Sequence, residues 1–218
     1  MKTFLSIGTG PGIGLATAKR FAHEGFHVII SGRNKEKQEA MREELAKDGF
    51  SVEAIILDAS NLEAVRSTIL EMSTQHEGVD VLHYNAAAMH QASIGSQNMD
   101  TFLPDLATNV GGALVAIQTL EPIMTKQGAG SILLTGGLFA TDPNPEYLSL
   151  SIGKAAIRNL AYGLFKPFKQ KNIHVATVTV AAFVEANSAA SKNIADAFWG
   201  LHTSDPKEWE AEITYSEN

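Results

Sequence analysis

Short apolar runs alternate with amphipathic stretches along the whole chain. Runs rich in Val, Ile and Leu predict strands at 3–7, 28–30, 51–58, 79–84, 130–137 and 173–180. Apolar residues three or four positions apart predict helices at 15–22, 35–48, 61–76, 101–126, 147–169 and 188–201, before a last edge strand at 209–215. Strands that alternate with helices through short connections predict an α/β fold, a doubly wound parallel sheet flanked by helices.

Glycines are concentrated between the first predicted strand and the first predicted helix. This segment reads Gly8, Thr9, Gly10, Pro11, Gly12, Ile13 and Gly14. Glycine allows a positive φ and the close approach of a ligand, and the amino end of the following helix attracts an anion. A Walker loop would need Lys and then Ser or Thr next, where this chain has Leu15 and Ala16. The spacing Gly8-xxx-Gly12-x-Gly14 favours a dinucleotide-binding turn, and a tight turn without a ligand is the alternative.

The second predicted strand ends at Ser31-Gly32-Arg33-Asn34. In dinucleotide-binding folds, an acidic residue here binds the ribose 2′-hydroxyl, whereas an arginine nearby accommodates a 2′-phosphate. This strand is followed by Arg33 and by no acid, so we expect Arg33 and Asn34 to bind NADP in preference to NAD. The alternative is that Arg33 is a solvated residue at the strand end.

Asp58 and Ala59 close the third predicted strand. Ligands of open α/β sheets bind at the carboxyl ends of the strands, so we expect Asp58 and Ala59 to contact the adenine edge of the cofactor. The segment Asp58-Ala59-Ser60-Asn61 is also typical of a helix cap, and this alternative stays open.

A zinc-protease pattern occurs at His23-Glu24-Gly25-Phe26-His27, which spells HExxH. Two histidines four positions apart share a ligand face only on a continuous helix, and Gly25 is expected to end this one. His27 then belongs to the next strand. We therefore expect no metal site from this motif, and none is predicted elsewhere.

Composition narrows the class of protein. The 218 residues fit one domain, 44% are hydrophobic, 19% are charged, and none is cysteine. The net charge of −7 argues against nucleic acid as a partner, and no apolar run is long enough to span a membrane. The absence of cysteine and of an export signal fits a cytoplasmic protein.

The glycine pattern, Asp58, the segment Asn85-Ala86-Ala87 after the fourth strand, and Lys154 in a late helix together resemble the short-chain dehydrogenase/reductase family. The resemblance covers nearly the whole chain. It implies a single NAD(P)-binding domain of Rossmann type over 1–218, with a short substrate lobe at about 185–218. It also implies that Asn85, Ala86, Ala87 and Lys154 contact the cofactor, and that Val184 borders the nicotinamide.

Two catalytic hydroxyls of the family are missing from this chain. The family has a tyrosine four residues before its lysine and a serine after the fifth strand, where this chain has Leu150 and Gly137, preceded by Gly136. Lys154 remains, and the resemblance implies that Asn109 holds a water in the proton relay. Two other residues are candidates for the missing proton donor: Tyr147 near the start of the late helix, and His90 after the fourth strand. For each of them, a surface or packing role is the alternative.

Two functions follow from this pattern. The first is an NADP-dependent oxidoreductase of small carbonyl or alcohol substrates with a non-standard proton donor. The second is a protein of the same fold that binds NADP without catalysis, as a structural, sensing or partner subunit. The resemblance further implies a homodimer or homotetramer formed through the helices near 101–126 and 147–169, with simple packing of these helices on the sheet as the alternative.

Overall fold

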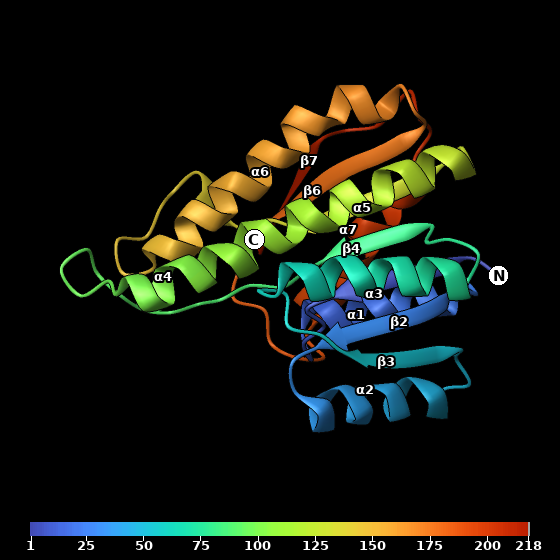
Figure 1. The fold of residues 1–218 in the computed structure, drawn as a ribbon, viewed down its shortest axis with the longest axis horizontal. Coiled ribbons are helices and arrows are strands. Elements are labelled where there is room, and N and C mark those ends of the chain that lie inside the picture. Colours follow the sequence, from blue (N-terminus) through green and yellow to red (C-terminus); the bar gives the residue numbers. More distant parts are fainter. Residues whose placement is uncertain (218) are drawn as a thin grey trace.

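The computed structural model describes residues 1–217 and contains one parallel sheet of seven strands (Figure 1). The order across the sheet is β3-β2-β1-β4-β5-β6-β7, and all neighbouring strands run parallel. The chain reverses direction across the sheet between β1 and β4, which is the switch point where such folds bind ligands. The strands are β1 Thr3–Ile7, β2 His27–Gly32, β3 Val52–Ile56, β4 Val81–Tyr84, β5 Gly130–Thr135, β6 Ile173–Ala181 and β7 Glu212–Ser216.

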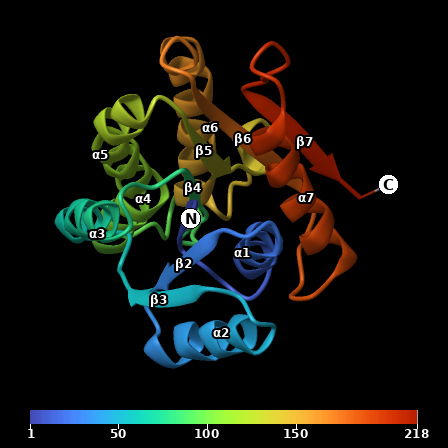
Figure 2. The ribbon, with the colours of Figure 1, turned by 90° about the vertical axis from the view of Figure 1, so that its right-hand side faces the viewer.

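Helices cover both faces of the sheet (Figure 2). The helices α1, α2 and α7 pack on one face, and α3, α5 and α6 pack on the other. This arrangement confirms the predicted doubly wound α/β fold. The helices are α1 Ile13–His23, α2 Lys35–Lys47, α3 Leu62–Gln75, α4 Met99–Leu106, α5 Gly112–Gln127, α6 Leu148–Lys169 and α7 Ala189–Thr203, with a 3₁₀ turn at Leu138–Ala140.

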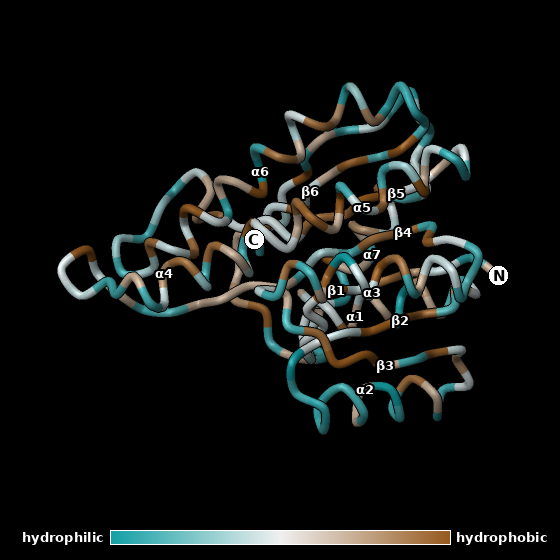
Figure 3. The backbone as a smooth tube through the Cα atoms, in the orientation of Figure 1, coloured by the Kyte–Doolittle hydropathy of each residue, from teal (hydrophilic) through white to brown (hydrophobic). Residues whose placement is uncertain are grey.

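Each face of the sheet has its own apolar core. One core packs residues of α1 and α7, such as Phe21 and Phe198, against β1 and β2. The other packs Ile69 of α3 and Leu120 of α5 against the opposite side of the same strands. The sheet is therefore buried on both faces, as a parallel sheet requires, and its strands carry the hydrophobic stretches seen in Figure 3.

The predicted elements are confirmed with shifts of a few residues at their ends. The third and fourth strands are shorter than expected, and the second is longer. Helix caps explain several boundaries, because Asn34, Asn61 and Ser188 each accept a hydrogen bond from an amide of the helix that follows. No helix within residues 1–217 has the length and apolarity needed to cross a bilayer.

The predicted long helix at 101–126 is interrupted by a π-helical turn at Ala107–Gly111, which joins α4 to α5. Residues distant in the sequence contact this turn: Tyr84 Oη donates a hydrogen bond to the carbonyl of Thr108, and Gly112 packs against Tyr84 and the carbonyl of Ala59. Any Cβ at Gly112 would lie 2.4 Å from Tyr84 Oη. Such turns are frequent at functional sites, and this one contains Asn109.

The C-terminal segment continues the main fold. Helix α7 lies along α1, and β7 pairs in parallel with β6 as the last strand of the sheet. The prediction that the segment near 185–218 holds a substrate stays a prediction. The last residue of this segment, 218, lies outside the described residues.

Candidate functional site

A cleft of about 520 Å³ opens at the carboxyl ends of the strands β1 to β4. It brings together residues from four loops that are far apart in the sequence. Ten of the predicted cofactor residues line it: Gly8, Thr9, Gly10, Pro11, Arg33, Asn34, Asp58, Ala59, Ala86 and Ala87. The cleft therefore lies at the topological switch point of the sheet, where the fold predicts a ligand.

The structure gives different reasons for glycine at the four positions of the first loop. Gly8 has a φ of +84°, and a Cβ there would lie 2.3 Å from Ala86 Cα. A Cβ at Gly14 would lie 2.9 Å from Thr9 Cα, so Gly14 permits helix and loop to pack closely. Gly10 has open space around it, and Gly12 has only the carbonyl of Val184 within 4 Å. Packing thus explains Gly8 and Gly14, whereas Gly10 and Gly12 leave room for a ligand.

Helix α1 begins at Ile13 without a capping side chain. Its N-cap is Gly12, and no side chain among residues 1–217 accepts a hydrogen bond from the first turn. By contrast, α2, α3, α4 and α7 are each capped by an asparagine or a serine, whereas α6 lacks a side-chain cap as α1 does. The first turn of α1 therefore offers amide donors and the positive end of the helix dipole to an anion.

Two basic residues near the end of β2 line the cleft. Arg33 lines the cleft, and so does Lys37, which lies one turn into α2. Asn34 caps α2, because its Oδ1 accepts a hydrogen bond of 2.8 Å from the amide of Lys37. Lys37 was not among the predicted cofactor residues, although its position four residues after Arg33, past a capping asparagine, could have indicated it.

Gln38 is a second lining residue that the sequence analysis missed. Its Nε2 donates a hydrogen bond of 2.9 Å to the carbonyl of Thr9 and so ties α2 to the glycine loop. Gly32 makes room for it, since a Cβ there would lie 2.3 Å from Gln38 Nε2. The Oε1 atom of Gln38 is buried without a hydrogen-bond partner among the described residues. An acceptor in this state at the wall of a cleft suits a ligand that carries a donor.

Asp58 both lines the cleft and orders the turn before α3. Its Oδ1 accepts hydrogen bonds from the amide and the hydroxyl of Ser60, at 2.9 and 2.8 Å. The helix itself is capped by Asn61. The hydrogen bond from the Ser60 amide is the main reason that the pKa of Asp58 is lowered, and the nearby Arg33 contributes to it. Asp58 is therefore an anion at neutral pH.

A buried polar network lies under the cleft. Asn85 donates a hydrogen bond from Nδ2 to the carbonyl of Gly8 and accepts one from the hydroxyl of Thr135. Thr135 Oγ1 in turn lies 3.0 Å from Nε2 of His83. Burial, with a smaller effect of Lys154, lowers the pKa of His83 to about 3, so its imidazole is neutral. Asn85 thus stabilises the glycine loop through the hydrogen bond to Gly8, and it is not among the residues that line the cleft.

Lys154 lies on α6 and reaches the end of β5. Its Nζ donates a hydrogen bond of 2.7 Å to the carbonyl of Thr135. Burial lowers the pKa of Lys154 to about 8. Leu150, one turn before it on the same helix face, is buried and carries no proton to transfer.

Gly137, not Gly136, stands beside the lysine. A Cβ at Gly137 would make ordinary contacts of 3.5 Å with the methylene groups of Lys154. A Cβ at Gly136 would lie 2.6 Å from Oγ1 of Thr177. Gly137 is therefore the position at which a serine would face the site, and Gly136 is required by packing.

Asn109 is buried in the π-helical turn and fastens the loop that follows β4. Its Oδ1 accepts a hydrogen bond of 2.7 Å from the amide of Ala88, and its Nδ2 donates to the Ala88 carbonyl at 3.1 Å. A Cβ at Gly153 would lie 2.5 Å from Asn109 Cβ, so α6 passes very close. Asn109 thereby holds Ala88, in the loop that also carries Ala86 and Ala87.

A histidine, an aspartate and a serine form a hydrogen-bonded chain next to this loop. His90 Nδ1 lies 2.6 Å from Oδ1 of Asp105, and Ser149 Oγ donates a hydrogen bond of 2.7 Å to Asp105 Oδ2. Asp105 is 1% exposed, whereas the His90 side chain is 61% exposed. An exposed imidazole is thus held in place by a buried carboxylate, an arrangement that suits general acid–base chemistry.

Tyr147, the other candidate donor, immediately precedes α6. Its ring stacks on Phe139 in the turn after β5, at 6.1 Å between centroids. No hydrogen bond of its hydroxyl occurs within the described residues, whereas His90 has the Asp105 partner. Val184 is half-exposed in the loop after β6, where its carbonyl approaches Gly12.

Comparison with known proteins agrees with this architecture. The family described as short chain dehydrogenase matches residues 2–196. The chain belongs to the short-chain dehydrogenase family. Among its relatives, oxidoreductase asL5 of Sarocladium schorii is 30% identical over 181 residues, covering 83% of this chain and 72% of that protein. Glucose 1-dehydrogenase of Gluconobacter oxydans is 30% identical over 185 residues, with 84% and 70% covered.

Solved structures of the family share the fold. A metagenomic short-chain oxidoreductase in complex with NADP superposes with a TM-score of 0.90 at 19% identity, covering 98% of this chain and 96% of the other. A short-chain dehydrogenase from Rhodopseudomonas palustris gives a TM-score of 0.90 at 25% identity, covering 100% and 99%. The predicted family and the Rossmann-type fold are confirmed.

Proposed function

We propose that this short-chain dehydrogenase is an NADP(H)-dependent oxidoreductase that acts on a small carbonyl or alcohol substrate. The observation that carries the proposal is the cleft at the switch point, which the glycine loop lines together with Arg33 and Lys37. Two cations at the ribose end suit a 2′-phosphate, and no acid replaces them at the end of β2. Several structural neighbours, among them the metagenomic short-chain oxidoreductase, bind NADP or NADPH, which supports the same choice.

The residues present fit a dinucleotide in three respects. Gly10 leaves open space for a pyrophosphate, and the first turn of α1 has no capping side chain to compete with it. The buried Oε1 of Gln38 lacks a donor that a ribose or adenine group would supply. In this proposal Asp58, Ala59, Ala86 and Ala87 line the cofactor, and Lys154 binds the nicotinamide ribose.

When bound, NADP supplies or accepts the hydride in the reaction. The chain must then move a proton to or from the substrate oxygen, and Leu150 and Gly137 leave the two usual positions without a hydroxyl. His90 is the donor that the geometry favours over Tyr147. Its Nδ1 is engaged by Asp105, so its exposed Nε2 is the atom that would exchange the proton with the substrate.

The proposed assembly is a homodimer or a homotetramer formed through the helices near 101–126 and 147–169. Supporting it, these helices expose large apolar side chains on their outer surface, namely Leu103, Leu114, Ile152 and Tyr162.

Turnover of NADPH with a panel of small aldehydes and ketones tests the proposal. Oxidation of NADPH by the unaltered protein, lost in His90→Gln but retained in Tyr147→Phe, is the expected result. Tight binding of NADPH without turnover of any member would contradict it and favour the non-catalytic alternative. Loss of turnover in Tyr147→Phe alone would transfer the donor role to Tyr147.

A further inference from the structure

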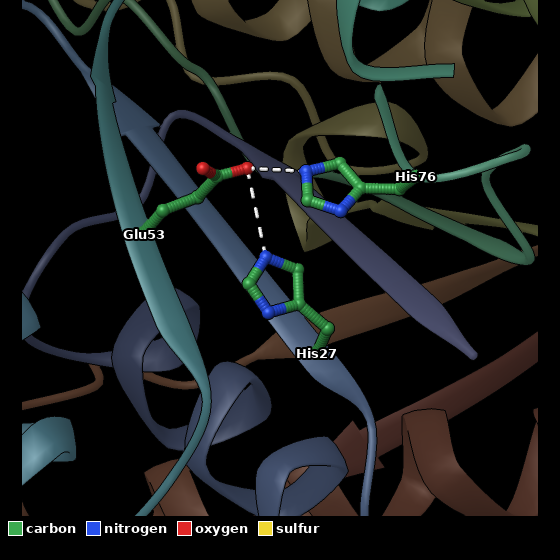
Figure 4. A group of neighbouring side chains, drawn as sticks. All are labelled: His27, Glu53 and His76. Carbon is green, nitrogen blue, oxygen red and sulfur yellow. Dashed lines mark hydrogen bonds and ion pairs between the residues drawn. The ribbon is translucent and has the colours of Figure 1, made fainter. Parts of the chain in front are cut away.

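Two histidines and a glutamate meet at the edge of the sheet opposite the cofactor cleft (Figure 4). His27 begins β2, Glu53 lies on β3, and His76 immediately follows α3. His27 and Gly32 stand at the two ends of β2, so the cluster lies about 16 Å from the cleft at roughly 3.3 Å per residue. It belongs to a different part of the molecule from the proposed active site.

Strand register explains why these residues face one another. In the pairing of β2 with β3, Glu53 lies opposite Ile29, two residues after His27. Side chains two apart on a strand share a face, so His27 and Glu53 both point to the face that α3 covers. His76 at the end of α3 completes the group from above.

The three side chains have the spacing of a metal site. Nε2 of His76 lies 2.7 Å and Nε2 of His27 lies 3.6 Å from Oε1 of Glu53, and the candidate ligand atoms all lie within 4.8 Å of one another. Two ligands of one zinc ion, each bound at about 2.0–2.2 Å, lie roughly 3.4 Å apart in tetrahedral geometry. Side-chain adjustments of about an ångström would bring all three atoms to one ion.

His27 is oriented by a partner outside the group. Its Nδ1 lies 2.7 Å from Oγ of Ser51, while its Nε2 is buried and has no hydrogen-bond partner within the described residues. When Nδ1–H donates to Ser51, the lone pair of Nε2 is directed at Glu53 and His76. A hydrogen bond at the other ring nitrogen is the usual support of a metal-binding histidine.

We propose that His27, Glu53 and His76 form a binding site for a zinc ion. Two imidazoles and one carboxylate are a ligand set that zinc prefers, and a water completes the fourth position. Exposure of the side chains by 14%, 30% and 18% gives the ion a route from solvent.

The two imidazoles stack on each other with their ring centroids 4.5 Å apart, so they reach the group side by side from β2 and from the end of α3.

A zinc ion at this position would cross-link three elements of the fold. It would join β2, the edge strand β3 and the end of α3, just before a turn in which Glu77 and Gly78 have positive φ. Because it binds the folded chain only, it would raise the unfolding temperature. The site contains no residue of the cofactor cleft, so NADPH affinity is expected to be unaffected.

Calorimetric titration of the tag-free, chelator-treated full chain with zinc chloride tests the proposal. One equivalent is expected to bind, and His76→Gln and Glu53→Gln are each expected to weaken the affinity by more than about 100-fold, since loss of an outer-shell partner alone costs 10–100-fold. His23→Gln is the matched control, because His23 belongs to the HExxH pattern but packs on Phe50 and is expected to leave binding unchanged. Circular dichroism checks that each variant folds.

Cobalt(II) gives a second readout that does not depend on stability. The chain has no cysteine, so absorption bands of tetrahedral cobalt must come from nitrogen and oxygen ligands. These bands are expected in the wild type and His23→Gln and absent from His27→Gln. Zinc binding that is equal in all variants, no zinc binding, or a preference for magnesium would each overturn the proposal. None of these outcomes would affect the proposed oxidoreductase activity.

Discussion

His90 and Asp105 are joined by a contact of 2.6 Å between Nδ1 and Oδ1, although the imidazole is exposed and the carboxylate is buried. Ser149 holds the other carboxylate oxygen at 2.7 Å. Ser149 adjoins Leu150, the position where the family has its catalytic tyrosine. In the proposed function, this oriented imidazole takes the role of the missing proton donor.

Removing the imidazole is expected to slow catalysis without weakening cofactor binding. His90→Gln should lower kcat by about 10²–10⁴-fold, the usual contribution of a general acid. Asp105→Asn should lower it less, because the imidazole remains but loses its orientation. Steady-state kinetics together with NADPH titration separate the two effects. A kcat within a factor of two of wild type in His90→Gln would contradict the assignment, and His23→Gln serves as the histidine control.

Restoring the two hydroxyls of the family is expected to recover part of the activity that His90→Gln loses. Leu150→Tyr with Gly137→Ser, added to His90→Gln, places a phenol one turn before Lys154 and a serine beside it. Turnover should rise at least about tenfold above that of His90→Gln, a modest part of what a general acid contributes. Absence of rescue in a folded triple variant that still binds NADPH would show that the substrate oxygen does not lie at this position.

The two adjacent glycines are expected to respond differently to substitution. Gly136→Ala should lower the free energy of unfolding by about 1–3 kcal/mol, because its Cβ would collide with Thr177. Gly137→Ala should change it by less than about 0.5 kcal/mol, since its Cβ makes ordinary contacts with Lys154. Urea unfolding of the two variants measures the difference. Equal losses would contradict the packing described for β5.

Acid is expected to unfold the protein through its buried histidines. Burial lowers the pKa of His83 to about 3 and that of His202 to about 4, below the ordinary value of 6.5. Between the folded and the ordinary pKa values, the histidines of the unfolded chain bind protons and those of the folded chain do not. The contribution of these histidines to the free energy of unfolding is therefore fully present above pH 6.5 and is lost as the pH falls toward 3. Thermal unfolding across this window checks the sign. A Tm that is constant or rises on acidification would contradict it.

The pattern along the chain predicted the strands, the helices and the cofactor loops because local periodicity and glycine spacing carry that information. Arg33 and Asp58 could be predicted as cofactor residues because each follows a strand, and ligands of open α/β sheets bind at the carboxyl ends of the strands. The π-helical turn was not predicted, since it depends on the contacts of Gly112 with Tyr84 and Ala59, which are far from it in the sequence.

The sequence patterns also could not predict which side chains the tertiary packing brings together. Asp105 lies 15 residues from His90 and 44 from Ser149. His27 attracted attention through the HExxH pattern, but its neighbours in the fold are Glu53 and His76, not His23. The glycine loop was interpreted as a whole, whereas the structure separates the packing glycines 8 and 14 from the open positions 10 and 12.

The central claim, that the cleft binds NADP through its glycine loop and the cations at the end of β2, is tested most directly by fluorescence titration with NADPH and NADH. We predict a lower Kd for NADPH. Arg33→Ala should weaken NADPH binding by about 1.5–3 kcal/mol, the value of a charged hydrogen bond, which is roughly 10- to 100-fold, and leave NADH almost unchanged. A Kd for NADH equal to or below that for NADPH, or no binding of either, would contradict the account.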